Sequence, residues 1–175
     1  MKSHLGKIHI YTGPGQGKTQ AALGLALRAL GRGYKVCVIQ FMKGKLSGEN
    51  LIAKKLAPDY KIYQFGKPGF IKKGEGTMQD KKLAKQGLDF AKKILQEKKI
   101  DLLILDEVNV ALDFGLLKLQ DVIEFLKRDR TGVEIILTGR AAHRKVCELA
   151  DLVTYMKNAK HYFKKGIGAR EGIEF

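Results

Sequence analysis

The stretch TGPGQGKT at residues 12–19 follows a short β-type run at residues 7–11 and opens an alanine- and leucine-rich segment at residues 19–30. A glycine-rich turn between a strand and a helix is the context of a phosphate-binding loop. Glycines let backbone N–H groups turn toward phosphate oxygens, the helix N-terminus adds partial positive charge, and Lys18 adds a full charge. The stretch therefore predicts a nucleotide-phosphate site, formed by Thr12, Gly13, Pro14, Gly15, Gln16, Gly17, Lys18 and Thr19.

The loop is one residue shorter than usual. The common spacing is G-x-x-x-x-G-K-[ST], and here the position five before Gly17 is Thr12 rather than glycine. Gly13 gives the shorter form G-x-x-x-G-K. A turn that merely connects a strand to a helix is the alternative, and the GKT sequence at this junction argues against it.

A second motif lies at residues 101–107, where the apolar run DLLIL is followed by Asp106 and Glu107. In parallel sheets ligands bind at the carboxyl ends of strands, so both carboxylates can reach a metal ion near Thr19. Mg²⁺ prefers oxygen ligands and bridges substrate phosphates. The alternative is that the acidic residues only cap a following helix. The two motifs in this order predict binding of a nucleoside triphosphate with Mg²⁺, through Thr19, Asp106 and Glu107.

Strand-like and helix-like segments alternate along the rest of the chain. Apolar runs at residues 36–41, 60–65, 133–138 and 152–156 alternate with helical patterns at residues 49–57, 77–99, 119–126 and 143–150. This alternation predicts an α/β fold of the P-loop NTPase (RecA-like) type, with a mostly parallel sheet flanked by helices on both faces. No composition break divides the chain, so we expect residues 1–175 to form a single domain. Residues 157–175 lack periodicity and are expected to be an irregular C-terminal tail closing on the site.

Composition excludes several classes of protein. No apolar run approaches the roughly 20 residues that cross a bilayer, and the N-terminus lacks the apolar region of a signal peptide. The two cysteines, Cys37 and Cys147, lie far apart in the chain, which argues against a disulfide framework or a cysteine zinc site. We therefore expect a cytoplasmic protein without membrane contact.

The charge is strongly positive. The chain has 33 Lys and Arg against 18 Asp and Glu, a net charge of +15, and residues 61–99 alone hold eleven lysines and four acidic residues. Such an excess attracts polyanions, although a solvated lysine-rich helix face is the simpler explanation. A nucleic-acid binder is disfavoured because the sequence has no aromatic stripe or recognition-helix signature.

Five motifs together resemble the P-loop cob(I)alamin adenosyltransferases. They are TGPGQGKT, QFMKG-x₃-GEN at residues 40–50, LILDEVNVAL at residues 103–112, ILTGRA at residues 136–141 and KHYFKKGIGAREGIEF at residues 160–175. The resemblance covers nearly the whole chain and keeps the family's order. The P-loop is shared with many NTPases, whereas the TGR segment and the C-terminal motif, which includes His161, are far more specific.

The resemblance implies an enzyme that transfers the 5′-deoxyadenosyl group of ATP to the cobalt of a reduced Co(I) corrinoid and releases triphosphate. ATP and the corrinoid are then co-substrates, and Mg²⁺ is the cofactor. Lys18 would stabilise the leaving triphosphate, Glu107 would serve as a metal ligand because no water needs activation, and Arg140 would contact a phosphate or the ribose. The family also suggests a flavoprotein reductant and a homodimer.

The glycine-rich loop at residues 66–76 is the expected corrinoid contact. The family places an aromatic pair there, and this chain has Phe70 at the first position and Lys72 at the second. Phe70 is thus predicted to cover the lower face of the cobalt, the alternative being a loop residue plugged into the core. The four glycines of the loop are expected to provide hinge freedom.

Two rival functions share part of this pattern. A RecA-like ATPase or nucleotide kinase has the P-loop and the Asp-Glu pair, but it does not account for the TGR and C-terminal motifs. An ATP-regulated nucleic-acid-binding protein would account for the charge. Corrinoid-dependent release of triphosphate, rather than phosphate, distinguishes the first rival from the adenosyltransferase.

Overall fold

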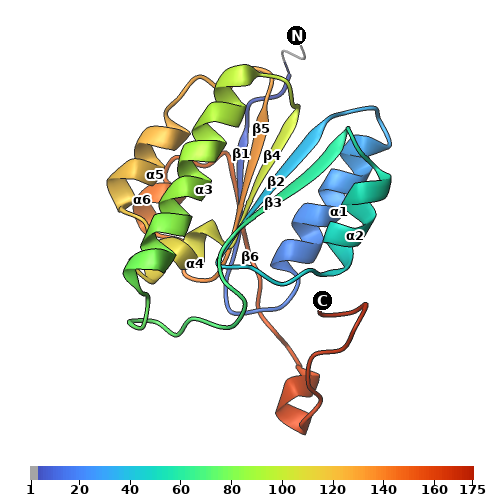
Figure 1. Cartoon of the computed structure of the whole chain (residues 1–175), viewed down its shortest axis with the longest axis vertical. Coiled ribbons are helices and arrows are strands. Elements are labelled where there is room, and N and C mark those ends of the chain that lie inside the picture. The colour runs from blue at the N-terminus through green and yellow to red at the C-terminus, as the bar shows by residue number, and fades with distance from the viewer. Residues whose placement is uncertain (1–3) are drawn as a thin grey trace.

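A computed structural model describes residues 4–175, whose centre is a six-stranded sheet in the order β3-β2-β4-β5-β1-β6 (Figure 1). All neighbouring strands are parallel. The expected domain includes residues 1–3, which lie outside the described part. The strands are β1 (Ile8–Thr12), β2 (Val36–Phe41), β3 (Tyr60–Phe65), β4 (Leu102–Asp106), β5 (Glu134–Thr138) and β6 (Leu152–Tyr155).

Helices cover both faces of the sheet, as the sequence predicts (Figure 1). On one face lie α1 (Lys18–Leu30) and α2 (Gly48–Lys55). On the other face lie α3 (Met78–Glu97), α4 (Val108–Asp113), α5 (Leu119–Leu126) and α6 (Arg144–Cys147). None of the helices within residues 4–175 has the length and apolar content to span a membrane.

The central strands are apolar because they have no face in water. Every residue of β2 and β4 is buried, which explains why VCVIQF and LLILD are near-continuous apolar runs. Two apolar clusters flank the sheet, one centred on α1 and the other on α3 and α5. The edge strand β6 differs, because all of its residues are exposed.

Three local expectations need correction. The predicted helix at residues 143–150 extends only over α6 (Arg144–Cys147). The segment after Glu107 forms α4, which the apolar pattern did not predict because the helix has only six residues. The C-terminal tail contains a 3₁₀ helix, η1 (Tyr162–Lys165).

The register of the sheet sets which residues lie side by side near the carboxyl ends of the strands. Gln40 on β2 is the register partner of Asp106 on β4, and Leu105 is that of Leu137 on β5. Because the strands are parallel, their carboxyl ends lie along one edge, where the loops that follow β1, β2, β4 and β5 converge.

The two thiols test this arrangement. Cys37 is buried on β2 and burial raises its pKa to about 12. Burial also raises the pKa of Cys147, but this thiol is only partly buried and a reagent can reach it. Thiolate is the reactive form, so we expect one thiol per chain to react with a disulfide reagent at pH 8 in the native state and both in denaturant. Cys147→Ser should remove the native reaction. Two fast-reacting thiols in the native protein would contradict the coverage of β2 by α3.

Candidate functional site

The phosphate-binding loop lies between β1 and the start of α1, beside a cavity of about 600 Å³. Six of the eight predicted residues line this cavity, namely Pro14, Gly15, Gln16, Gly17, Lys18 and Thr19. Thr12 and Gly13 do not line it. The buried Thr12 hydroxyl instead accepts a hydrogen bond from the backbone N–H of Ala142, 3.1 Å away, and so ties the loop to the segment after β5.

Lys18 is the buried cation of the loop. Its side chain folds back so that Nζ donates to the carbonyl oxygen of Gly15. Burial lowers the pKa of Lys18, the carboxylate of Glu107 opposes that shift, and the guanidinium of Arg140 adds to it. An anion placed in the cavity would therefore meet two neighbouring cations that have few other partners.

The Asp106 carboxylate is the most heavily hydrogen-bonded group of the site. Its Oδ1 accepts from the hydroxyls of Thr19 at 2.8 Å and Thr138 at 2.7 Å. Its Oδ2 accepts from Nζ of Lys43 at 2.7 Å and Nε2 of Gln40 at 3.4 Å. The side chain is only 1% exposed, so these donors satisfy a charge that water does not reach.

Glu107 faces both the cavity at the phosphate-binding loop and a second cavity. It occupies the N-cap position of α4 with a left-handed φ of 63°, but its side chain makes no capping bond. The helix-cap interpretation is therefore wrong for this carboxylate. Burial and the nearby Asp106 raise its pKa, while Lys43, Lys18 and Arg140 oppose that shift.

These residues suit a metal ion that prefers oxygen. The Thr19 hydroxyl is bonded to Asp106, Glu107 follows directly, and the donor atoms of these three side chains are all hard oxygens. Within residues 4–175 no three His, Cys, Asp or Glu side chains converge as a complete metal site. A metal here would need oxygens from the nucleotide, as Mg²⁺ usually does.

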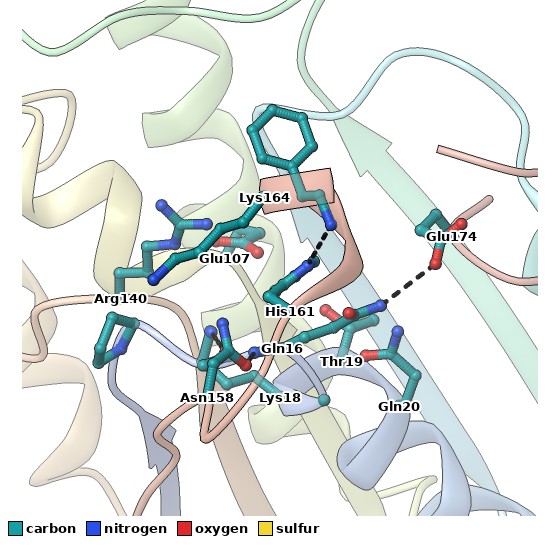
Figure 2. A pocket seen from close by; sticks show the side chains of 14 residues that line it. Gln16, Lys18, Thr19, Gln20, Glu107, Arg140, Asn158, His161, Lys164 and Glu174 are labelled. Atoms are coloured by element: carbon teal, nitrogen blue, oxygen red, sulfur yellow. Dashed lines mark hydrogen bonds between the residues drawn. The ribbon is translucent and has the colours of Figure 1, made fainter. Parts of the chain in front are cut away.

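The C-terminal tail packs against the phosphate-binding loop (Figure 2). The backbone N–H of Gly15 donates to the carbonyl of Met156 at 2.9 Å, and that of Gln16 donates to Oδ1 of Asn158 at 2.9 Å. The Gln16 amide also bonds the Tyr162 hydroxyl at 3.0 Å. The tail thus supplies a wall of the cavity at the phosphate-binding loop, formed by Asn158, His161, Phe163, Lys164 and Glu174.

Most of these tail residues were missed by sequence reasoning. Only His161 was singled out, and its Nδ1 accepts the backbone N–H of Phe163 at the start of η1 while its ring lines the cavity. The C-terminal motif was the available signal, but without periodicity it did not reveal which side chains face the loop.

A second cavity of about 430 Å³ adjoins the first. Phe70 lines it and is fully exposed, so the alternative that this ring is plugged into the core is wrong. Lys72 is absent from its lining and lies near Glu75 on the surface. Glu107 and Arg140 line both cavities and form the boundary between them.

The loop that carries Phe70 is anchored at its first glycine. A Cβ atom on Gly66 would lie 2.4 Å from the backbone nitrogen of Lys43, so Gly66 permits close backbone packing rather than hinge motion. Gly69, with φ of 112°, is the residue that turns the chain immediately before Phe70.

Fold and site together define a P-loop nucleotide-binding α/β protein. A solved structure with this fold is the KaiC-like protein PH0186 from Pyrococcus horikoshii OT3. The match has a TM-score of 0.53 and 16% identity, and it covers 89% of this chain and 75% of that one.

The particular family follows from sequence comparison. The profile described as ATP:corrinoid adenosyltransferase BtuR/CobO/CobP matches residues 4–175. Curated proteins named corrinoid adenosyltransferase from Sinorhizobium sp. and Escherichia coli K12 are each 35% identical over 97% of this chain, and the matches cover 80% and 86% of those proteins. The chain belongs to the ATP:corrinoid adenosyltransferase family.

Gly15 offers a test of the contact between loop and tail. A Cβ on Gly15 would lie 2.7 Å from the carbonyl carbon of Met156 and 2.9 Å from that of Lys157, the first residue of the tail, so Gly15→Ala must displace the loop or the tail. We expect at least a tenfold weaker ATP affinity by calorimetry. Gly24→Ala is the matched control, since nothing lies within 4 Å of its Cβ and alanine favours the helix by about 1 kcal/mol. Unchanged ATP binding in Gly15→Ala would contradict the packing.

Proposed function

We propose that this chain transfers the 5′-deoxyadenosyl group of ATP to the cobalt of a Co(I) corrinoid and releases triphosphate. Family membership supports the reaction. The observation that carries it is the pair of adjoining cavities, one against the phosphate-binding loop and one beside Phe70, which share Glu107 and Arg140. Two substrates bound in these cavities would meet at that boundary.

The reaction is a substitution at carbon. The cobalt electron pair forms the Co–C5′ bond, the C5′–O5′ bond breaks, and its electron pair leaves on the triphosphate. Negative charge therefore grows on the triphosphate, where the Lys18 ammonium and the backbone N–H groups of the loop can stabilise it. Because no water is activated, the reaction needs no general base, and Glu107 does not act as one.

Thr19, Asp106 and Glu107 are the residues that would hold Mg²⁺ with the phosphates. The ion would supply positive charge to the leaving group. Arg140 is exposed at the boundary between the cavities, and we assign to it a contact with a phosphate or the ribose. Lys18 and Glu107 are the residues to which we assign the largest effects on turnover.

Residues 157–175 belong to the same domain in this proposal and close over the bound nucleotide. The bonds from Gln16 to Asn158 and Tyr162 support this role, because they tie the tail to the residue next to the phosphate site. Both cysteines are free thiols, which supports a cytoplasmic location.

A homodimer and a flavoprotein reductant complete the proposal. The exposed apolar residues of the edge strand β6, Leu152, Val153 and Tyr155, provide a surface that a second copy would cover. The net charge of +15 favours an acidic protein as the electron donor. Membranes and nucleic acid have no part in it.

Lys18→Ala tests the function and the site together. With ATP, Mg²⁺ and chemically reduced corrinoid, the wild-type protein should cause the Co(I) absorbance to fall and should release one triphosphate per turnover. The variant should lose turnover and bind ATP more weakly by about 1.5–3 kcal/mol, because a charge-assisted contact is removed. Lys35→Ala, distant from the loop, is the control. Phosphate release without corrinoid would favour an ATPase or kinase, and near-normal turnover in Lys18→Ala would refute the site.

Phe70→Ala separates pocket building from control of the cobalt. An exposed ring on a loop can pack under the cobalt and displace the lower axial ligand, which makes Co(II) easier to reduce. We expect activity from pre-reduced Co(I) to survive and activity from Co(II) to fall at least tenfold, about 1.4 kcal/mol. The measurement is the initial rate from each oxidation state, on the wild type and on Phe70→Ala. Equal losses would show that Phe70 only builds the cavity.

A further inference from the structure

Lys43 lies between two carboxylates and pairs with both. Its Nζ is 2.7 Å from Oδ2 of Asp106 and 3.8 Å from Oε1 of Glu49. Burial lowers the pKa of Lys43, but the carboxylates of Asp106, Glu49 and Glu107 outweigh that effect and hold the pKa above its usual range. The side chain therefore carries a positive charge next to a residue that we assign to the metal.

The backbone fixes where this ammonium group can reach. Met42, the preceding residue, has a left-handed φ of 60°, and its N–H donates to the carbonyl of Phe65 at 3.1 Å. Gly66, the next residue after Phe65, packs against the backbone of Met42 and Lys43. A non-glycine residue held in this conformation is costly, and such turns concentrate at functional sites. Lys43 thus turns back toward the end of the sheet, where its ammonium group lies between Asp106 and Glu49.

A buried amide joins the two carboxylates. Nε2 of Gln40 donates to Oε1 of Glu49 at 2.9 Å and approaches Oδ2 of Asp106 at 3.4 Å. Oε1 of Gln40 accepts from Gln64 at 3.0 Å and from Asn50 at 3.3 Å, which fixes the orientation of the amide. Glu49 is therefore held beside Asp106 independently of Lys43.

We propose that Lys43 is a counter-cation that occupies the Asp106 carboxylate in competition with the metal, and that it transfers to Glu49 when the metal binds. The proposal rests on the metal role of Asp106 proposed above. Oδ1 of Asp106 already accepts two hydroxyl groups, so the ammonium group takes the other oxygen. A divalent cation bound at this carboxylate repels the ammonium group, and Glu49 is the second anion within its reach.

The exchange also changes the wall of the second cavity. Lys43 lines that cavity together with Phe70, and it lines a third one, of about 280 Å³, together with Glu49. Movement of its ammonium group from Asp106 to Glu49 therefore links occupation of the metal site to the shape of the proposed corrinoid cavity. Lys43 acts here as a positioning residue, through Asp106.

The test measures how strongly the metal improves ATP binding, without corrinoid and without turnover. The affinity for ATP is determined by calorimetry in EDTA and in excess Mg²⁺. The readout is the dissociation constant in EDTA divided by the dissociation constant in Mg²⁺. In Lys43→Met, the Asp106 charge has no ammonium partner when the metal is absent. When the metal is present, no ammonium group competes with it for Asp106. We expect ATP binding to weaken in EDTA and the ratio to rise at least tenfold. Structural damage alone would weaken both affinities and leave the ratio unchanged.

Glu49→Gln provides an independent arm that keeps Lys43. The ammonium group then lacks its second partner and stays on Asp106, so the ratio should fall at least threefold. In the double variant Lys43→Met/Glu49→Gln, the ratio should equal that of Lys43→Met. Lys67→Met is the matched control, because it removes a lysine that pairs with the buried Asp80 at 2.9 Å outside the site, and it should leave the ratio unchanged.

The outcomes separate the two proposals. A wild-type ratio near one would refute the metal role of the site and the exchange with it. A wild-type ratio well above one that is unchanged or lower in Lys43→Met would refute the exchange alone. The exchange would also be refuted if Glu49→Gln changed the ratio by the same factor in the wild type and in Lys43→Met.

Discussion

The Asp106 carboxylate is the constraint on which the candidate site depends. It accepts hydrogen bonds from Thr19 on α1, Thr138 on β5, Gln40 on β2 and Lys43 in the loop after β2. A buried charge is tolerated only when its partners are in place. The carboxylate therefore ties four elements together at the point where the phosphate-binding loop begins its helix. Any displacement of one element changes the partners of the others.

Residues with a left-handed backbone conformation follow three strands at the edge of the sheet where Asp106 lies. Among residues 4–175, Met42, Glu107 and Ala141 are three of the four non-glycine residues with positive φ. They follow β2, β4 and β5, and each turns the chain sharply next to a residue of the site. The strain is local, and the buried strands behind the turns hold it in place.

Two surfaces of different character meet at Glu107 and Arg140. The first cavity is lined by the phosphate-binding loop and the tail, whereas the second cavity is lined by Phe41, Phe70, Ile71 and Phe114 among others. Such a boundary suits a reaction between a polyanion and a large, flat substrate, because each partner finds its own kind of surface. The parallel sheet produces this arrangement, since all of its strands point to the same edge.

Much of the fold was predictable from local patterns. Three patterns are each recognisable from a few consecutive residues. They are the apolar runs of β2 and β4, the GKT sequence at the start of α1 and the carboxylates after residue 105. They fix the class of fold, the phosphate-binding loop and the two acidic residues. The end of α6 and the existence of α4 were less accessible, because such short helices show less than two turns of periodicity.

The partners of these residues were decided only by the tertiary structure. Lys43 and Gln40 meet Asp106 because β2 lies beside β4 in the sheet, although some sixty residues separate them in the sequence. The tail reaches Gln16 because β6 lies beside β1. The sequence by itself determined which residues bear charge and which strands are buried. Strand order and the left-handed turns, which depend on packing across the whole sheet, determined which charges meet.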